Sequence, residues 1–147
     1  MSARQTSDAC EDSHMVEVRI GTRGDSLLLA TDAPDLPISV TLESARLRAG
    51  TKPRDCFDLR GLPAYMADVA GTAMSEWVGP KTWESLEGDI RLVAGQAAGR
   101  VTITASLREA RLDPINDGWS ARLDITLDPG EELRQCASDV AAFLQGC

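Results

Sequence analysis

Hydrophobic and polar residues alternate with a period of two along the second half of the chain. The apolar residues of the three segments are Leu86, Ile90, Leu92 and Ala94; Val101, Ile103, Ala105 and Leu107; and Trp119, Ala121, Leu123, Ile125 and Leu127. Successive side chains of a strand point to opposite faces, so this alternation predicts antiparallel strands with one dry and one wet face. A hairpin at 96–99 and a longer loop at 109–118 are expected to join them.

The first half of the chain predicts three more strands. Apolar residues alternate at 16–20 and 38–42, and an apolar run covers 27–30. Residues 23–25 read Arg-Gly-Asp, which we interpret as a hairpin turn rather than an integrin motif, since Gly and Asp favour turns. After residues 44–45 the apolar phase slips, which predicts a β-bulge. Residues 49–58 are expected to form a loop.

Two segments change to a helical period. Over 60–77 the apolar face comprises Leu62, Met66, Val69, Ala73 and Trp77, with Pro63 in the first turn. Gly71 weakens this helix by about 1 kcal/mol relative to Ala. A second helix follows Asp128, which we expect to cap it with Glu131. Its apolar stripe comprises Leu133, Cys136, Ala137, Val140 and Leu144.

Together these elements predict an α+β domain in the order β-β-β-α-β-β-β-α. We expect one antiparallel sheet of about six strands with both helices packed on one face. Residues 1–13 are expected to form a flexible tail and residues 14–147 a single domain. The two halves have a similar order of elements.

The chain is acidic, with 15 basic and 23 acidic residues and a net charge of −8. This balance disfavours nucleic acids and anionic membranes and favours a basic protein partner. The N-terminal residues have no basic and apolar stretches typical of a secretion signal, so we expect a cytoplasmic location. The four cysteines are therefore expected to be reduced.

Candidate chemistry is sparse. His14 is the single histidine, and no Cys-x-x-Cys or glycine-rich phosphate motif occurs, so we expect no metal and no cofactor. Glu84 and Glu87 could act as acid and base if burial raised one pKa, or could simply be surface charges. Asp113 and Asp117, with the asparagine between them, could bind a hard cation but also suit an ordinary turn.

The tryptophans are the remaining candidates. Each could pack at the rim of the core or could anchor a partner. Trp83 is the best anchor candidate, because its phase in the pattern is unclear. The expected partner-binding residues are therefore Trp83, Glu84, Glu87, Asp113 and Asp117.

One stretch carries a family resemblance. Residues 81–88 read Lys-Thr-Trp-Glu-Ser-Leu-Glu-Gly. This stretch, with Trp77, the hairpin at 99–102, Trp119 and the helix start at 129–133, is similar to a small bacterial family of unknown function. The same pattern, over about residues 57–145, resembles WapI-type immunity proteins, which neutralise polymorphic toxins. The resemblance implies the fold and an immunity-like role.

Three functions are consistent with these features. The first is a non-enzymatic cytoplasmic protein-binding domain, such as an immunity protein that neutralises a basic toxin domain. The second is an accessory or regulatory domain that self-associates through an open sheet edge. The third is an enzyme that uses carboxylates alone.

Overall fold

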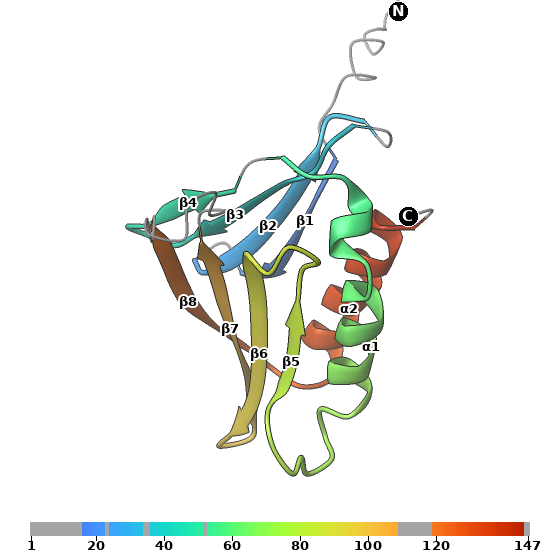
Figure 1. Ribbon diagram of the computed structural model, residues 1–147. Helices are drawn as coiled ribbons and strands as arrows, with labels where there is room; N and C mark the ends of the chain where they lie inside the picture. Colours follow the sequence, from blue (N-terminus) through green and yellow to red (C-terminus); the bar gives the residue numbers. More distant parts are fainter. Residues whose placement is uncertain (1–15, 23, 34–35, 52, 109–118, 146–147) are drawn as a thin grey trace, which may run out of the picture.

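The computed structural model describes residues 16–22, 24–33, 36–51, 53–108 and 119–145. Their strands form two antiparallel sheets of four strands each, in the orders β1-β2-β3-β4 and β5-β6-β7-β8 (Figure 1). The first sheet comprises β1 (Val16–Gly21), β2 (Ser26–Thr31), β3 (Ser39–Glu43) and β4 (Arg48–Gly50). The second comprises β5 (Lys81–Glu84), β6 (Ile90–Ala97), β7 (Arg100–Arg108) and β8 (Ser120–Leu127).

A helix follows each sheet. A 3-10 turn, η3 (Cys56–Leu59), leads into α1 (Leu62–Gly71), and α2 (Glu131–Phe143) ends the described fold. The chain is therefore a tandem of two similar units, each a four-stranded meander followed by a helix. We call β1 to α1 the N-terminal unit and β5 to α2 the C-terminal unit.

The two units share one hydrophobic core. The inner faces of the sheets meet where β8 contacts β1 and β3, and the paired helices close the other side (Figure 1). Each helix reaches across to the other unit, since α2 packs on β1 and α1 contacts β5. Burial of apolar side chains from both units in one cluster stabilises the two units jointly.

The α+β class and the antiparallel strands agree with the sequence pattern, but the single six-stranded sheet is wrong. Alternation shows which face of a strand is dry, and a dry face can pack on a second sheet as well as on helices. The expected bulge is also wrong. Residues 44–47 form a turn closed by a bond from the Ser44 amide to the Leu47 carbonyl at 2.8 Å, and β4 pairs back on β3.

The start of the second sheet differs from the expectation too. Leu86 does not share the dry face of β6, because β5 ends at Glu84 and a turn leaves the Leu86 side chain 58% exposed. Trp119 is likewise 39% exposed, although it is in phase with the buried residues of β8. Alternation holds within the strands, and these two residues lie just outside them.

The helices are shorter than the pattern suggested. Helix α1 ends at Gly71, although Ala73 stays buried and Trp77 packs against the core from the following loop. The stripe of α2 is buried as expected, from Leu133 to Leu144. Its N-cap is Gly130, not Asp128, and the Asp128 amide instead donates to Glu132 Oε1 at 2.8 Å.

The cysteines differ in state. Cys136 is a free, buried thiol, and burial raises its pKa to about 11. Cys56 is disulfide-bonded, which differs from the reduced thiol expected at this position. The expectation of a reduced thiol followed from the expected cytoplasmic location, not from the spacing of the cysteines.

Candidate functional site

A buried polar cluster lies where the two units meet. It comprises Arg54, Asp58, Ser85 and Asp89, and each of them is at most 7% exposed. Arg54 precedes η3 and Asp58 lies in it, whereas Ser85 and Asp89 flank the turn between β5 and β6. The cluster therefore ties the end of the first sheet to the beginning of the second.

Arg54 is the centre of this polar cluster. Its guanidinium binds Asp89 through two hydrogen bonds, from Nη1 at 2.9 Å and from Nη2 at 2.7 Å, and Nη1 also donates to Asp58. Ser85 Oγ donates to Asp89 Oδ1 at 3.0 Å and accepts the Ile90 amide at 3.1 Å. A two-bond contact between guanidinium and carboxylate fixes both groups in one geometry.

The charges of the polar cluster hold one another ionised. Burial alone would raise the pKa of Asp89, but hydrogen bonds from Arg54 and Ser85 outweigh it and hold that pKa below its ordinary value. Burial would lower the pKa of Arg54, and the two carboxylates raise it instead. Arg54 Nε is buried with no hydrogen-bond partner among the described atoms. The cluster is too enclosed to meet a substrate, and its contacts assign it a structural role.

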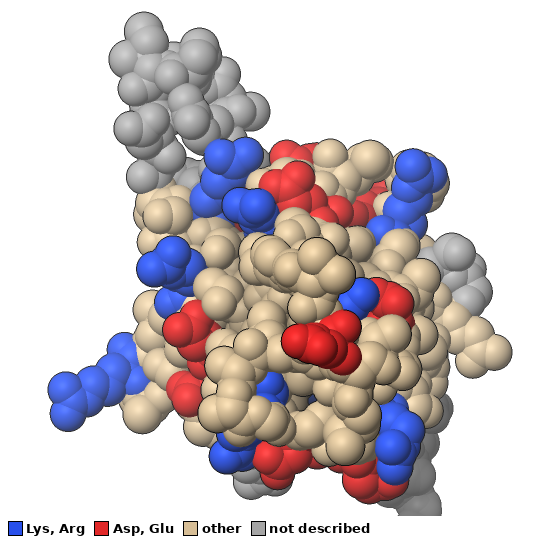
Figure 2. All heavy atoms as spheres, turned by 90° about the horizontal axis from the view of Figure 1, so that it is seen from below, with Lys and Arg blue, Asp and Glu red and all other residues tan. Residues whose placement is uncertain are grey.

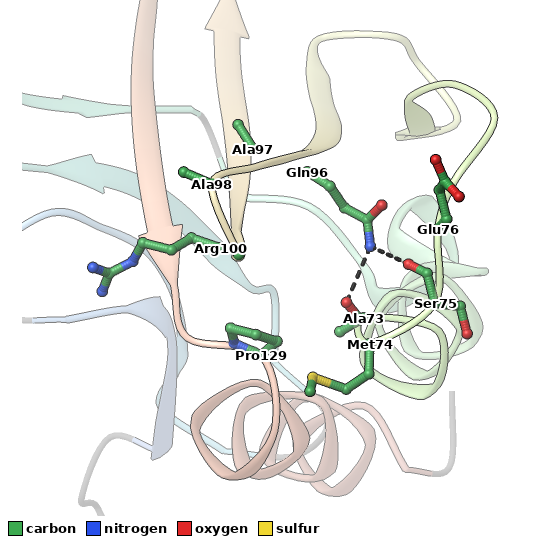
Figure 3. Close-up of a pocket in the computed structure, with 10 residues that line it drawn as sticks. Ala73, Met74, Ser75, Glu76, Gln96, Ala97, Ala98, Arg100 and Pro129 are labelled. Carbon is green, nitrogen blue, oxygen red and sulfur yellow. Dashed lines mark hydrogen bonds between the residues drawn. The ribbon is translucent and has the colours of Figure 1, made fainter.

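The accessible site lies at the opposite end of the second sheet. A hollow of about 550 Å³ opens there between the loop after α1, the β6–β7 hairpin and the link from β8 to α2 (Figure 3). We call it the lower hollow, because it lies at the bottom of Figure 1. Small or apolar residues form much of its lining, namely Ala73, Met74, Ala97, Ala98, Gly99 and Pro129.

One amide side chain builds the wall of the lower hollow. Gln96 Nε2 donates to the carbonyl oxygens of Ala73 at 3.0 Å and Ser75 at 2.6 Å, and Gln96 Oε1 accepts the Trp77 amide at 2.9 Å. Figure 3 shows the two donated bonds reaching the loop after α1. Because Gln96 satisfies three backbone groups at once, it holds this loop against β6.

Two apolar side chains of the loop after α1 are exposed: Met74 lines the lower hollow, and Val78 follows two residues after its lining residue Glu76. Met74 is 81% exposed and Val78 is fully exposed. Met74 extends toward the Pro129 side of the hollow, whereas Glu76 and Arg100 point away from it (Figure 3). The end view shows a surface formed mostly by uncharged residues, with acidic and basic groups both around its rim and near its centre (Figure 2). Exposed apolar groups beside a concave surface are typical of protein-binding sites.

Of the residues expected to bind a partner, none that the structure describes is among those that line the lower hollow. Trp83 is buried at 8% exposure, and its indole Nε1 donates to the Arg60 carbonyl at 3.1 Å. Glu84 and Glu87 are exposed, and Glu84 makes a long ion pair with Arg91 at 3.8 Å. Asp113 and Asp117 lie outside the described residues. The structure therefore places Trp83 in the core and both glutamates on the surface.

Sequence reasoning missed the lower hollow. The loop after α1 was assigned in part to a helix over 60–77, and Gln96 to a plain hairpin at 96–99. The available signal was that Met74 and Val78 are apolar but lie off the apolar face predicted for residues 60–77. The hydrogen bonds of Gln96 reach residues 19 to 23 positions away, so no local sequence pattern indicates them.

The described residues show no group of three or more His, Cys, Asp or Glu side chains that could hold a metal ion. Within the same part of the chain, no helix has the length and apolar character needed to cross a membrane.

Comparison with known proteins identifies the family. Residues 9–147 match the family described as a family of unknown function (DUF6228), and the chain belongs to it. No curated protein and no solved structure matched the chain. The match extends well beyond residues 57–145, and the comparisons do not show the resemblance to WapI-type immunity proteins.

Proposed function

We propose that this chain is a non-enzymatic protein-binding domain whose partner docks at the lower hollow. The observation that carries this proposal is the exposure of Met74, which lines a concave and largely apolar surface, together with that of Val78 in the same loop. Removing such side chains from water on binding is favourable by about 25 cal/mol per Å² of apolar area. Methionine adapts its shape to a partner, so it suits the rim of a docking site.

The charge of the chain favours a basic partner. The net charge is −8. Near the lower hollow Asp128 pairs with Arg100 at 2.7 Å, whereas Glu76 makes no ion pair with any described residue. An acidic protein attracts a cationic partner at long range, which raises the association rate more than the final affinity.

An immunity role is the specific form of this proposal. It is supported by the resemblance of the pattern over about residues 57–145 to WapI-type immunity proteins and by the acidic charge. In that role the chain would act in the cytoplasm and bind a basic toxin domain. The disulfide at Cys56 is more typical of an oxidising compartment. Mass mapping of the Cys56 linkage in unreduced protein from native cells therefore tests the location.

The test of partner binding is site-specific photo-crosslinking in native cells. A benzophenone side chain replaces Met74 in one variant and Thr104, on the outer face of the second sheet, in the control. We expect one protein to be captured at position 74 and not at position 104. The purified partner should then bind the wild type, and Met74→Glu with Val78→Glu should weaken that binding at least about tenfold, or 1.4 kcal/mol.

Two results would contradict the proposal. One is equal labelling at both positions. The other is a captured protein whose affinity is unchanged by the two glutamate substitutions. Higher salt should slow association with a basic partner, and an unchanged rate would reject the electrostatic part. For the immunity form, co-expression of the chain must protect cells from the captured partner.

A further inference from the structure

Strand β8 is an edge strand of the second sheet, and it approaches the first sheet in its second half, where Ile125 lies against Gly21 of β1 (Figure 1). It spans eight residues and pairs with β7 along its whole length. In the part of the chain that the structure describes, no backbone hydrogen bond joins β8 to a strand on its other side. An edge of this length presents unpaired amide and carbonyl groups that can pair with another strand.

The first half of β8 is also incompletely covered on its apolar side. Ile125 and Leu127 are 1% exposed, whereas Ala121 and Leu123 are only partly buried and Trp119 is 39% exposed. All five residues are in phase, so they belong to one face. The core of this chain covers that face at one end of the strand and leaves it open at the other.

The charges on the opposite face of β8 are self-complementary. Arg122 and Asp124 are both exposed and lie on either side of Leu123. When two copies of β8 pair antiparallel with Leu123 opposite the partner's Leu123, Arg122 lies opposite the partner's Asp124. By symmetry Asp124 then lies opposite the partner's Arg122. Asp124 Oδ1 accepts Thr104 Oγ1 at 2.8 Å, which leaves its second oxygen for the new ion pair.

We infer that two copies of this chain associate through β8, in an antiparallel pair centred on Leu123. The dimer is isologous, so the same strand serves both sides, and the two sheets become one continuous sheet. The pairing places Leu123 on the partner's Leu123 and sets two cross-strand ion pairs on the outer face. Such opposite-charge pairs fix the register, and like charges in the same positions oppose it.

Light scattering coupled to gel filtration tests the pairing from a few micromolar to several hundred micromolar protein. We expect the mass to rise from the 15.8 kDa of one chain toward twice that value. Arg122→Asp sets acidic residues against acidic residues, and Asp124→Arg sets basic against basic. Each single variant should remain monomeric. A mixture of the two variants should form heterodimers, and the variant with both substitutions should dimerise again.

The control is Arg91→Asp, which makes the same charge change on β6, two strands from the edge. It should dimerise like the wild type. Circular dichroism should show that all variants are folded. A wild type that stays monomeric at the highest concentration overturns the inference. So does dimerisation of both single variants, or a mixture of them that stays monomeric.

Discussion

The N-terminal and C-terminal units have the same order of elements but are built differently. Strands β6, β7 and β8 have eight to nine residues and alternate between a buried and a more exposed face. Strands β1, β2 and β3 have five or six residues, and the first five residues of β2 are buried on both faces. One unit therefore has a wet outer face, and the other encloses its central strand.

The links from sheet to helix differ in the same way. In the C-terminal unit β8 reaches α2 through a short turn at 128–130. In the N-terminal unit the longer link after β4 contains Arg54 and Asp58 of the polar cluster. The comparison shows that two units with the same topology can be stabilised by different interactions. Buried charge supports the N-terminal link, whereas exposed contacts of Asp128 with Arg100 and Glu132 support the C-terminal link.

The largest expected effect comes from the polar cluster. Asp89→Asn leaves Arg54 without the carboxylate that binds it through two hydrogen bonds. Removing one member of a buried ion pair costs about 3–5 kcal/mol. Urea denaturation at neutral pH should show this loss in the free energy of unfolding. Glu84→Gln, an exposed carboxylate on the neighbouring strand, should change it by less than about 0.5 kcal/mol. Equal effects would show that the cluster does not hold the units together.

Two turn glycines give the next comparison. Gly21 has a φ of +119°, and a Cβ there would lie 2.3 Å from the Asp25 carbonyl oxygen and 2.8 Å from Ile125. Gly99 has a φ of +76°, with open space around a Cβ. Gly21→Ala should therefore destabilise the fold by about 3 kcal/mol, through strain and overpacking. Gly99→Ala should cost about 1 kcal/mol from strain alone.

Thermal unfolding of both alanine variants measures the difference. A larger effect at Gly99 would contradict the close contact between the first turn and β8.

Acid should reduce the difference between the wild type and Asp89→Asn. The pKa of Asp89 is lowered in the folded protein from its ordinary value of 3.8. Its contribution to stability is therefore present above that ordinary value and is lost as pH falls through the folded pKa. Asp89→Asn lacks the contribution at every pH. Unfolding curves from about pH 7 to about pH 3 should converge for the two proteins. Parallel curves would contradict the lowered pKa.

The smallest effects should come from the outer faces of the two sheets. Arg19 Nη1 binds Glu43 at 2.9 Å and Ser26 at 2.9 Å, in a partly buried position over the first sheet. Thr104 binds Asp124 on the exposed face of the second sheet. Arg19→Ala should cost about 1 kcal/mol, because it also uncovers Ser26. Thr104→Ala should cost about 0.5 kcal/mol or less.

A denaturation series on the two variants would rank these contacts. The reverse order would show that the first sheet is not better enclosed than the second.

The sequence predicted those parts of the fold in which one face of an element is exposed to water and the other is buried. Strands β6 to β8 and the stripe of α2 follow from local alternation, because each residue is either wet or dry. The separation into two sheets did not follow, since it depends on which dry faces meet. The turn at 44–47 looked like a bulge, because both interrupt the period of two.

The candidate site was hidden for a related reason. Asp89 binds Arg54 across 35 positions, and no local pattern joins the two residues. Gln96 and the loop after α1 are also distant in sequence. Residues 81–88 were the best identifier of the chain, yet the structure uses Trp83 for packing. An aromatic residue outside a clear period could not be assigned to core or surface from the sequence.

The three bonds of Gln96 have a consequence for how the chain can be divided. They bind Ala73, Ser75 and Trp77. After a cut between Val78 and Gly79, all three hydrogen bonds would join one fragment to the other. Each fragment would carry one unit, and each would expose the apolar face that the other covers. The polar cluster would add a specific charge match. The chain is therefore suited to reconstitution from two separately expressed pieces, as in a split reporter whose signal requires both pieces to meet.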